Sequence, residues 1–205
     1  MIVIVDYDAG NLRSVQRACA EVGIPALISN KAEDIRSAER IIFPGVGAAG
    51  SAMRSLTRSG MDQAIIDAYE TGTPILGICL GLQITLAHSE ENDQVTLKLL
   101  PGRVRRFRFL DRSIKVPHMG WNEVNVLKPH PVLAQVQPGD EFYFVHSYYP
   151  EPECAEDIYA QSEYEHSFCC AMGRKNYFAT QFHPEKSGRV GLELLKCFAE
   201  WDGQL

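Results

Sequence analysis

The sequence predicts an α/β protein with a mostly parallel central sheet, flanking helices and antiparallel additions to that sheet. Its first half alternates short β-branched runs with segments of helical periodicity, which is the pattern of βαβ units. Such alternation indicates a mostly parallel sheet that is covered on both faces. In the second half, strand-like pieces follow one another with no helical segment between them, which predicts antiparallel pairing.

The first elements follow from this alternation in chain order. We expect strands at residues 2–5, 26–29, 41–43 and 75–78. A helix should begin near Leu12, because Leu12, Val15, Cys19 and Val22 recur at helical spacing. Gly23, followed by Pro25, should end that helix. Its apolar stripe is expected to pack on the sheet.

Strand-like pieces dominate the second half. They occupy residues 104–109, 123–127, 142–145, 158–161, 169–172 and 178–181, and we expect them to add to the sheet in antiparallel fashion. A final helix is predicted over residues 188–201, where Val190, Leu194 and Phe198 follow at four-residue steps. Residues 80–87, directly after Cys79, also have the pattern of a helix.

Length and charge narrow the class of protein. The 205 residues, of which 45% are hydrophobic, are expected to form a single domain over residues 1–205. A net charge of −6 argues against a broad nucleic-acid surface. A local arginine cluster is expected to be the solvated face of a strand rather than a phosphate site, with a docking surface as the alternative; it comprises Arg103, Arg105, Arg106 and Arg108.

The N-terminus and the cysteines indicate a cytoplasmic protein. The segment MIVIVDYDAG is apolar for only a few residues and carries Asp6 and Asp8, so it resembles neither a signal peptide nor a membrane span. The six cysteines are irregularly spaced and fit neither a disulfide framework nor a metal site, so no metal is expected. Most of them should be small core residues, with Cys79 as the exception.

Cys79 lies in a glycine-x-nucleophile-x-glycine pattern at residues 77–81, the spacing of a nucleophile elbow. Glycines at both ends let strand and helix approach closely, so that the central side chain stands above the sheet. The helix N-terminus behind it favours negative charge on sulfur and leaves the Leu80 N–H for an oxyanion. By itself the pattern fits a buried structural cysteine between two packing glycines equally well.

The segment His183-Pro184-Glu185 favours the catalytic interpretation. A thiol nucleophile needs a base that takes and returns its proton, and the base needs an orienting group. Pro184 keeps His183 extended, and Glu185 is close enough in sequence to turn back to the imidazole. Taken alone, His183 would be interpreted as a structural histidine.

A third segment, Pro44-Gly45-Val46-Gly47, follows a predicted strand. Its glycines permit backbone N–H groups to face a ligand, so a second oxyanion donor can come from here. The alternative is a plain tight turn.

Together these segments resemble the class I (triad) glutamine amidotransferases. GICLGLQ at residues 77–83 and QFHPEKSG at residues 181–188 match the two catalytic signatures of that family. Further segments are similar to the glutaminase subunits of imidazole glycerol phosphate synthases: PGVG at 44–47, PHMGWN at 117–122 and YFVHSYY at 143–149. The resemblance extends from DYDAGN near the start to the last helix. It departs from the family at Asp8, at Ala49 and over residues 91–99.

The resemblance implies a role for each matching residue. Cys79 would be the nucleophile, His183 the base and then the acid, and Glu185 the residue that orients it. Leu80 with Val46 and Gly47 would form the oxyanion hole. Residues matching glutamine-binding positions are Gly47, Gln83, His146, Ser147 and Tyr148. Trp121 and Lys186 match positions at the partner interface. His88, His118, His130 and His166 receive no role.

The implied function is hydrolysis of glutamine to glutamate and ammonia, without a cofactor. The ammonia would pass to a (β/α)₈-barrel cyclase subunit in histidine biosynthesis, most simply in a heterodimer. The chain shows no nucleotide-binding loop for acceptor chemistry of its own. Two alternatives stay open: a paralogous glutaminase serving another synthase, such as an amino-sugar enzyme, and a catalytically silent scaffold subunit.

Overall fold

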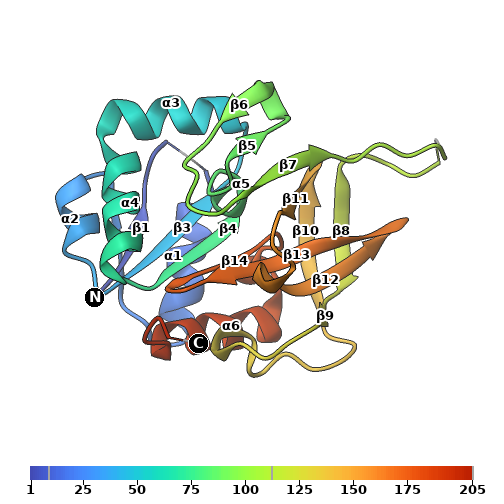
Figure 1. Ribbon diagram of the computed structural model, residues 1–205. Coiled ribbons are helices and arrows are strands. Elements are labelled where there is room, and N and C mark those ends of the chain that lie inside the picture. Colours follow the sequence, from blue (N-terminus) through green and yellow to red (C-terminus); the bar gives the residue numbers. More distant parts are fainter. Residues whose placement is uncertain (9, 112, 205) are drawn as a thin grey trace.

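The computed structural model describes residues 1–8, 10–111 and 113–204. Ala9, within the DYDAGN segment, lies outside this range. Over the described residues the main sheet has the strand order β2-β1-β3-β4-β14-β13-β12-β9 (Figure 1). Its strands are β2 (Ala26–Ser29), β1 (Ile2–Val5), β3 (Arg40–Gly45), β4 (Ile75–Cys79), β14 (Tyr177–Thr180), β13 (His166–Arg174), β12 (Ile158–Tyr164) and β9 (Asn125–Val126).

The first five strands of this order are parallel to one another, and the last three pair antiparallel. This confirms the predicted fold class. Parallel strands need helical crossovers, and antiparallel ones do not, which is why the helical segments are concentrated in the first half of the chain.

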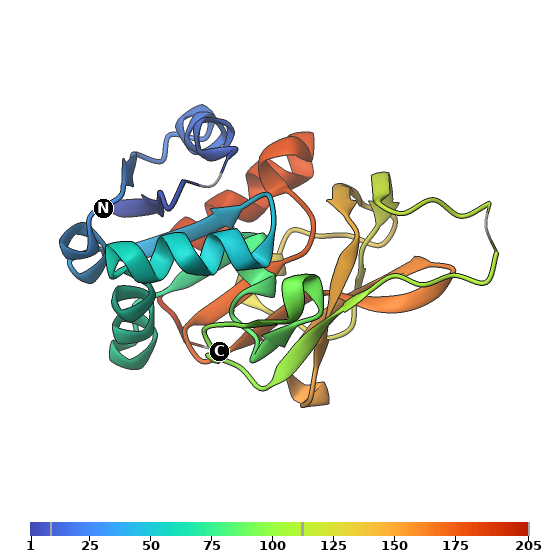
Figure 2. The ribbon, with the colours of Figure 1, turned by 90° about the horizontal axis from the view of Figure 1, so that it is seen from above.

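Helices cover both faces of the sheet (Figure 2). The side chains of β1 alternate between the two faces. Ile2 and Ile4 pack in a core cluster with residues of α1 (Leu12–Glu21) and α6 (Gly188–Glu200). Val3 and Val5 pack in a second cluster, on the side of α2 (Ala32–Arg36), α3 (Ala49–Ser59) and α4 (Met61–Thr71). All four residues of β1 are buried, as expected for a strand covered on both sides.

The two predicted amphipathic helices form with nearly the expected bounds. Val15 and Cys19 of α1 are buried, and Gly23 follows the helix with a φ of 77°, a left-handed conformation that favours glycine. In α6, Leu194 and Phe198 are buried, and the helix ends one residue before the predicted Trp201.

The antiparallel half differs from expectation in two ways. The piece expected at residues 178–181 forms β14, which pairs parallel with β4 and antiparallel only with β13. Two other predicted pieces leave the main sheet. Residues 142–145 belong to β10 (Glu141–His146), which pairs only with β8 (His118–Glu123) among the described strands. Residues 104–109 begin as β7 (Gly102–Arg106), which lies in a small sheet with β11 (Tyr148–Pro152), β5 (His88–Ser89) and β6 (Gln94–Val95). Residues 123–127 divide between the end of β8 and β9.

The β8–β10 pair lies outside the main sheet because its buried face packs against the face of that sheet. Phe142 and Phe144 of β10 are fully buried and share the second core cluster with Phe168 of β13 and with Phe182. The β8–β10 pair therefore packs over the main sheet instead of extending its edge. Alternating apolar residues specify which face of a strand is buried but not which strand is its neighbour.

The helix predicted over residues 80–87 is also shorter than expected. Helix α5 comprises only Leu80–Gln83. The backbone N–H groups of Thr85 and Leu86 then bond three residues back instead of four, and the Thr85 hydroxyl donates to the carbonyl of Leu82 at 2.6 Å. These tighter bonds end the helix. Four further turns are of the 3₁₀ type: Glu91–Asp93, Pro131–Leu133, Ala155–Asp157 and Pro184–Lys186.

Candidate active site

Cys79 is the last residue of β4, and it has an unusual backbone conformation. Its φ of 54° and ψ of −104° lie far from those of strand or helix. The flanking glycines are required by close contacts: a Cβ on Gly81 would lie 1.8 Å from the carbonyl oxygen of Phe43, and one on Gly77 would lie 2.5 Å from the Tyr177 hydroxyl. The chain thus forms the sharp strand-to-helix turn that the sequence predicted.

Strand β3 brings the Pro44–Gly47 turn beside the cysteine. In the parallel register of β3 and β4, Gly45 is the partner of Cys79. The strand extends two residues beyond the predicted end at Phe43, because its pairing with β4 continues through Gly45. The Tyr7 hydroxyl donates to the Pro44 carbonyl at 2.9 Å, and Gly47 follows with a φ of 105°. Only glycine adopts that conformation readily.

Strand β14 brings His183 to the other side of Cys79. Thr180 pairs with Ile78, and His183 follows three residues later, completely buried. The turn Pro184–Lys186 then reverses the chain, so that His183 Nδ1 lies 2.7 Å from Glu185 Oε1. Glu185 has no exposed side-chain surface. The pair has the geometry of an imidazole oriented by a carboxylate.

The electrostatics of His183 are dominated by its neighbours. Burial alone would lower the pKa of this imidazole, because it disfavours the charged form. Charge and hydrogen bonding from Cys79, and then from Glu185, outweigh burial and raise the pKa from 6.5 to about 10. His183 Nε2 makes no well-aligned hydrogen bond to any residue that the structure describes. The raised pKa favours the imidazolium form of His183.

A cavity of about 410 Å³ opens on Cys79. Its walls include every residue predicted for the oxyanion hole and for binding glutamine: Val46, Gly47, Leu80, Gln83, His146, Ser147 and Tyr148. Lys186 lines it as well. A cavity of this size, lined by a cysteine and by several polar side chains, fits a small polar substrate.

Trp121 does not reach this cavity. It lies on β8 with 54% of its surface exposed, and its ring contacts that of Tyr143 at a centroid distance of 6.1 Å. The Lys186 ammonium lies 5.7 Å from the centre of the same Tyr143 ring. The Tyr143 carbonyl in turn accepts the backbone N–H of His183 at 2.9 Å. Trp121, Tyr143 and Lys186 thus form one surface patch that is connected to the site through the backbone.

Three further residues belong to the site and were not predicted. Asn11 donates its amide to Glu185 Oε1, the same oxygen that faces His183. The amide of Gln181 lies 3.6 Å from Cys79 Sγ, and its oxygen accepts from Gln83 at 3.1 Å. Asn11 lies in the DYDAGN segment and Gln181 in the QFHPEKSG segment. Both segments resemble the family, and this resemblance could have pointed to the two residues.

Glu91 is the third. Its carboxylate lines the cavity and accepts the backbone N–H of Ala49 at 2.7 Å, and burial raises its pKa. It comes from the segment in which the sequence departs from the family pattern, so the motifs gave no signal for it. It is the acidic side chain among the residues that line this cavity.

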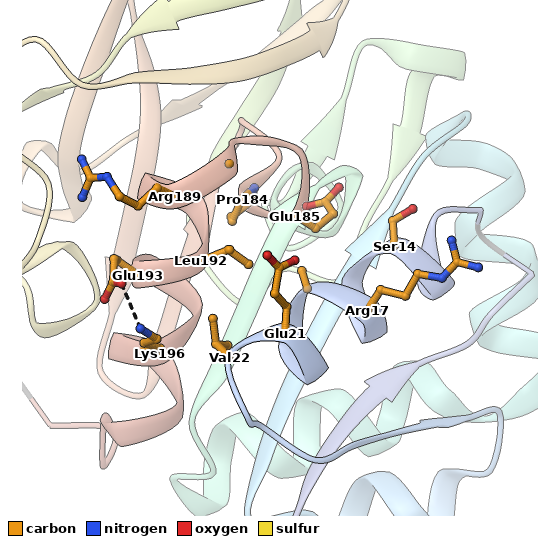
Figure 3. A pocket seen from close by; sticks show the side chains of 12 residues that line it. Ser14, Arg17, Glu21, Val22, Pro184, Glu185, Arg189, Leu192, Glu193 and Lys196 are labelled. Atoms are coloured by element: carbon orange, nitrogen blue, oxygen red, sulfur yellow. Dashed lines mark hydrogen bonds and ion pairs between the residues drawn. The ribbon is translucent and has the colours of Figure 1, made fainter.

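A larger cavity, of about 660 Å³, lies in the groove between α1 and α6 (Figure 3). It reaches Glu185 but not Cys79, and charged side chains of both signs line it, including Arg17, Glu21 and Arg189. The smaller cavity is the better candidate for a substrate site, because it contains the nucleophile and the polar groups around it.

The remaining sequence expectations concern the arginine cluster, the cysteines, metal binding and membrane spans. Arg105 pairs with Glu90 at 3.1 Å and with Glu151 at 2.9 Å, and Arg108 pairs with Glu90 at 3.2 Å, so carboxylates offset much of the arginine cluster. Cys19, Cys169 and Cys170 are buried core residues. Within the described ranges there is no group of acidic, histidine and cysteine side chains arranged to hold a metal, and no helix is long and apolar enough to span a membrane.

Comparison with known proteins identifies the class. The family model for class-I glutamine amidotransferases matches residues 3–200. The chain therefore belongs to the class-I glutamine amidotransferase family.

Within this family, the chain is similar to HisH subunits of imidazole glycerol phosphate synthases. The chain is 47% identical to the imidazole glycerol phosphate synthase subunit HisH of Maridesulfovibrio salexigens, over 98% of this chain and 97% of the relative. It is 47% identical to the HisH subunit of Desulfovibrio desulfuricans, over 98% and 94%. The solved structure of PurLQS from Thermotoga maritima shares the fold, with a TM-score of 0.73 at 19% identity, covering 97% of this chain and 96% of that one.

Proposed function

We propose that this chain is the glutaminase subunit of an imidazole glycerol phosphate synthase. It hydrolyses glutamine to glutamate and ammonia and supplies the ammonia to a cyclase subunit in histidine biosynthesis. The observation that carries the proposal is the cavity next to Cys79, where a cysteine at the end of a strand faces a buried His183–Glu185 pair in a chain with HisH relatives. We further propose that residues 1–205 act as one glutaminase domain in the cytoplasm.

The proposed chemistry has two halves. The Cys79 thiolate attacks the side-chain amide carbon of glutamine, and the imidazolium of His183 protonates the departing nitrogen, so that ammonia leaves and a thioester forms. His183, now neutral, takes a proton from water as the water attacks the thioester carbonyl. Collapse of that intermediate returns the cysteine and releases glutamate. Glu185 keeps the imidazole in one orientation and stabilises its positive charge.

Backbone N–H groups of Leu80 and of the Val46–Gly47 turn are proposed to stabilise the oxyanion in both halves. Removing one oxyanion donor typically lowers turnover about 10²- to 10³-fold. The position of the turn beside Cys79, set by the β3–β4 register, supports this role.

The far end of the cavity is proposed to hold the amino-acid group of glutamine. Its ammonium needs a carboxylate, and Glu91 supplies one next to the Gly47 turn. The α-carboxylate needs N–H or O–H donors, which Ser147 and the backbone of Tyr148 offer. Gln83 and His146 complete this wall. A substrate held at both ends would present its amide carbon to Cys79.

The partner is proposed to dock on the patch of Trp121, Tyr143 and Lys186. An exposed tryptophan next to a tyrosine ring is typical of interface anchors, and Lys186 lies over the same ring. Because Tyr143 also bonds the backbone of His183, docking at this patch has a short route to the site. We expect a heterodimer with a (β/α)₈-barrel cyclase.

The test combines the chain with such a cyclase and its ribonucleotide substrate. Cys79→Ala should abolish glutamine-dependent synthesis and glutamate release but leave synthesis from ammonium salt intact. Cys154→Ala, a partly exposed cysteine outside the cavity, is the matched control and should retain both activities.

The outcomes separate the alternatives. Glutamate release that persists in Cys79→Ala would rule out the assigned nucleophile. No glutamate release from the wild-type complex would indicate a silent scaffold. Glutamate release by wild type without any product from the cyclase would indicate that another synthase receives the ammonia.

A further inference from the structure

A chain of hydrogen bonds runs through two buried histidines to the wall of the candidate active site. Asn122 Nδ2 lies 3.3 Å from His118 Nε2, and His118 Nδ1 lies 2.9 Å from His146 Nε2. His146 Nδ1 lies 2.8 Å from the carbonyl oxygen of Tyr148. The β8–β10 register pairs His118 with His146 directly, which brings the two rings together.

The direction of every proton in this chain follows from its ends. The Tyr148 carbonyl only accepts, so His146 must carry its proton on Nδ1. Nε2 of a neutral His146 then accepts, and His118 must therefore donate from Nδ1. This leaves His118 Nε2 as an acceptor for the Asn122 amide.

The amide orientation of Asn122 agrees with this direction. Its oxygen accepts the backbone N–H of Glu123 at 2.9 Å, and its nitrogen also donates to the Glu163 carbonyl at 2.8 Å. If either histidine bound a second proton, two N–H donors would face each other in one of these contacts. Burial keeps both neutral: it lowers the pKa of His118 to about 4 and that of His146 to about 3.

The chain ends on an atom that organises the cavity. The Tyr148 carbonyl also accepts from Gln83 Nε2 at 2.9 Å, and that amide continues to Gln181, beside Cys79. His146, Ser147, Tyr148 and Gln83 all line the cavity. If His146 carried its proton on Nε2 instead, its Nδ1 lone pair would face the carbonyl and repel it. The tautomer of His146 therefore sets the position of this wall.

The His118 ring cannot easily turn away. It is stacked between Tyr164, at a centroid distance of 4.0 Å, and Phe144, at 5.0 Å. An aromatic ring at this position explains the stacking but not the hydrogen bonds at both of its nitrogens. A phenylalanine would satisfy the first requirement only.

We propose that His118 is a positioning residue for glutamine binding: by donating to Nε2 of His146 it stabilises the Nδ1–H tautomer that the Tyr148 carbonyl requires, and the two contacts together fix the Tyr148 and Gln83 wall of the cavity. The proposal rests on the proposed glutaminase function of the same cavity. It gives the PHMGWN segment a role inside the subunit, in addition to the partner contact proposed for Trp121.

Three substitutions test it. His118→Phe keeps a stacked ring but removes both hydrogen bonds. His118→Gln retains one donor and one acceptor and should restore much of the effect. His166→Phe is the matched control: His166 lies in the same aromatic cluster, 5.6 Å from Phe107 between ring centroids, and its Nε2 has no partner among the described residues.

Two measurements read the outcome. Nitrogen-15 NMR of histidine-labelled protein reports which nitrogen of His146 is protonated, with the assignment made through His146→Gln. Wild type and His118→Gln should show the Nδ1–H form, and in His118→Phe the share of that form should fall, because only the Tyr148 carbonyl still favours it. Steady-state kinetics should show the KM for glutamine raised about tenfold in His118→Phe, the effect of one lost hydrogen bond, with kcat changed far less.

The proposal is overturned if wild-type His146 carries its proton on Nε2. It is also overturned if His118→Phe binds glutamine like wild type, or if His166→Phe raises KM equally. Wild-type protein without any glutaminase activity would instead defeat the proposed function, while the tautomer measurement would still stand as a test of the hydrogen-bond chain.

Discussion

The amide of Asn11 and the imidazole of His183 share one oxygen of Glu185. Asn11 stands at the N-terminal boundary of α1 with a φ of 78°, yet its side chain does not cap that helix. It reaches across to a residue 174 positions later in the chain. The orientation of the carboxylate is therefore fixed from two sides, by the base it serves and by α1.

We expect Asn11→Gly to lower kcat for glutamine hydrolysis by roughly 10- to 100-fold, the effect of losing a hydrogen bond to a charged group. Glycine tolerates the left-handed backbone, so the loss would be due to the side chain rather than to strain. Ser14→Ala, on the same helix, is the control. Wild-type turnover in Asn11→Gly would show that the His183 contact alone holds Glu185.

Replacing Glu185 by glutamine should lower turnover by about 10²-fold or more while the fold is retained. An amide can still accept from the imidazole but cannot stabilise its charge. His183→Ala should lose more, because no base remains. Glutamate release at saturating glutamine, with circular dichroism as the check on folding, measures both; equal near-wild-type rates would contradict the assigned roles.

The same substitution should change how stability depends on alkaline pH. The folded pKa of His183 is raised above its ordinary value of 6.5, so its contribution to stability is complete below that pH and is lost as pH rises toward 10. Because Glu185 is one source of the shift, Glu185→Gln should flatten the decline. Urea unfolding at a series of pH values compares the two slopes; parallel curves would contradict the coupling.

His130 should make the protein sensitive to acid. Its ring is stacked on Phe178 and nearly inaccessible, and burial, followed by the charge of Lys128, lowers its pKa to about 3. Below pH 6.5 this histidine binds a proton in the unfolded chain but stays neutral in the folded chain. The stability that it contributes above that pH is therefore lost as pH falls.

Between roughly pH 4 and pH 6 this histidine alone should add about 1.4 kcal/mol per pH unit to the decline. His130→Phe should remove that part of the slope. At neutral pH it should be somewhat less stable, since the His130 ring accepts the Val132 N–H at 3.1 Å. An unchanged slope between the two proteins would show that the ring is protonated in the folded state.

Gly81→Ala should destabilise the protein by about 3 kcal/mol or more, because the added methyl meets backbone that cannot move aside. Gly72→Ala is a useful comparison: its φ of 88° is left-handed, but no atom lies within 4 Å of the added carbon. There only the backbone strain of about 1–2 kcal/mol applies. Thermal unfolding of the two variants separates contact from strain, and equal losses would contradict the close approach of α5 to Phe43.

The sequence patterns predicted the features that depend on neighbouring residues in the chain, namely single strands, single helices and local turns. Short apolar runs located β1, β2, β3 and β4, and helical spacing located α1 and α6. The fifth parallel strand, β14, was expected to pair antiparallel. The two signature segments located Cys79, His183 and Glu185, because each motif encodes a local turn that carries its side chain to the end of a strand.

Long-range partners could not be predicted in this way. Asn11, Gln181 and Glu91 enter the site from segments far apart in the chain. Asn11 and Gln181 lie in the motifs DYDAGN and QFHPEKSG, but their contacts depend on the fold, and no motif pointed to Glu91. The β8–β10 pair was missed for a related reason: alternation defines a buried face, but the choice of neighbouring strand depends on the whole core. Helix α5 is shorter than predicted because the Thr85 hydroxyl bonds the Leu82 carbonyl. Hydrophobic periodicity cannot predict such a side-chain hydrogen bond.

The pairing of β4 with β14 also determines when the thiol acquires its base. Cys79 lies in the first half of the chain, whereas its base follows the last strand to be synthesised. A ribosome has therefore built every other strand of the main sheet before the histidine leaves the exit tunnel. Until β14 inserts between β4 and β13, the cysteine has no proton acceptor beside it. On the proposed roles of Cys79 and His183, we expect that a subunit truncated before β14 does not release ammonia from glutamine.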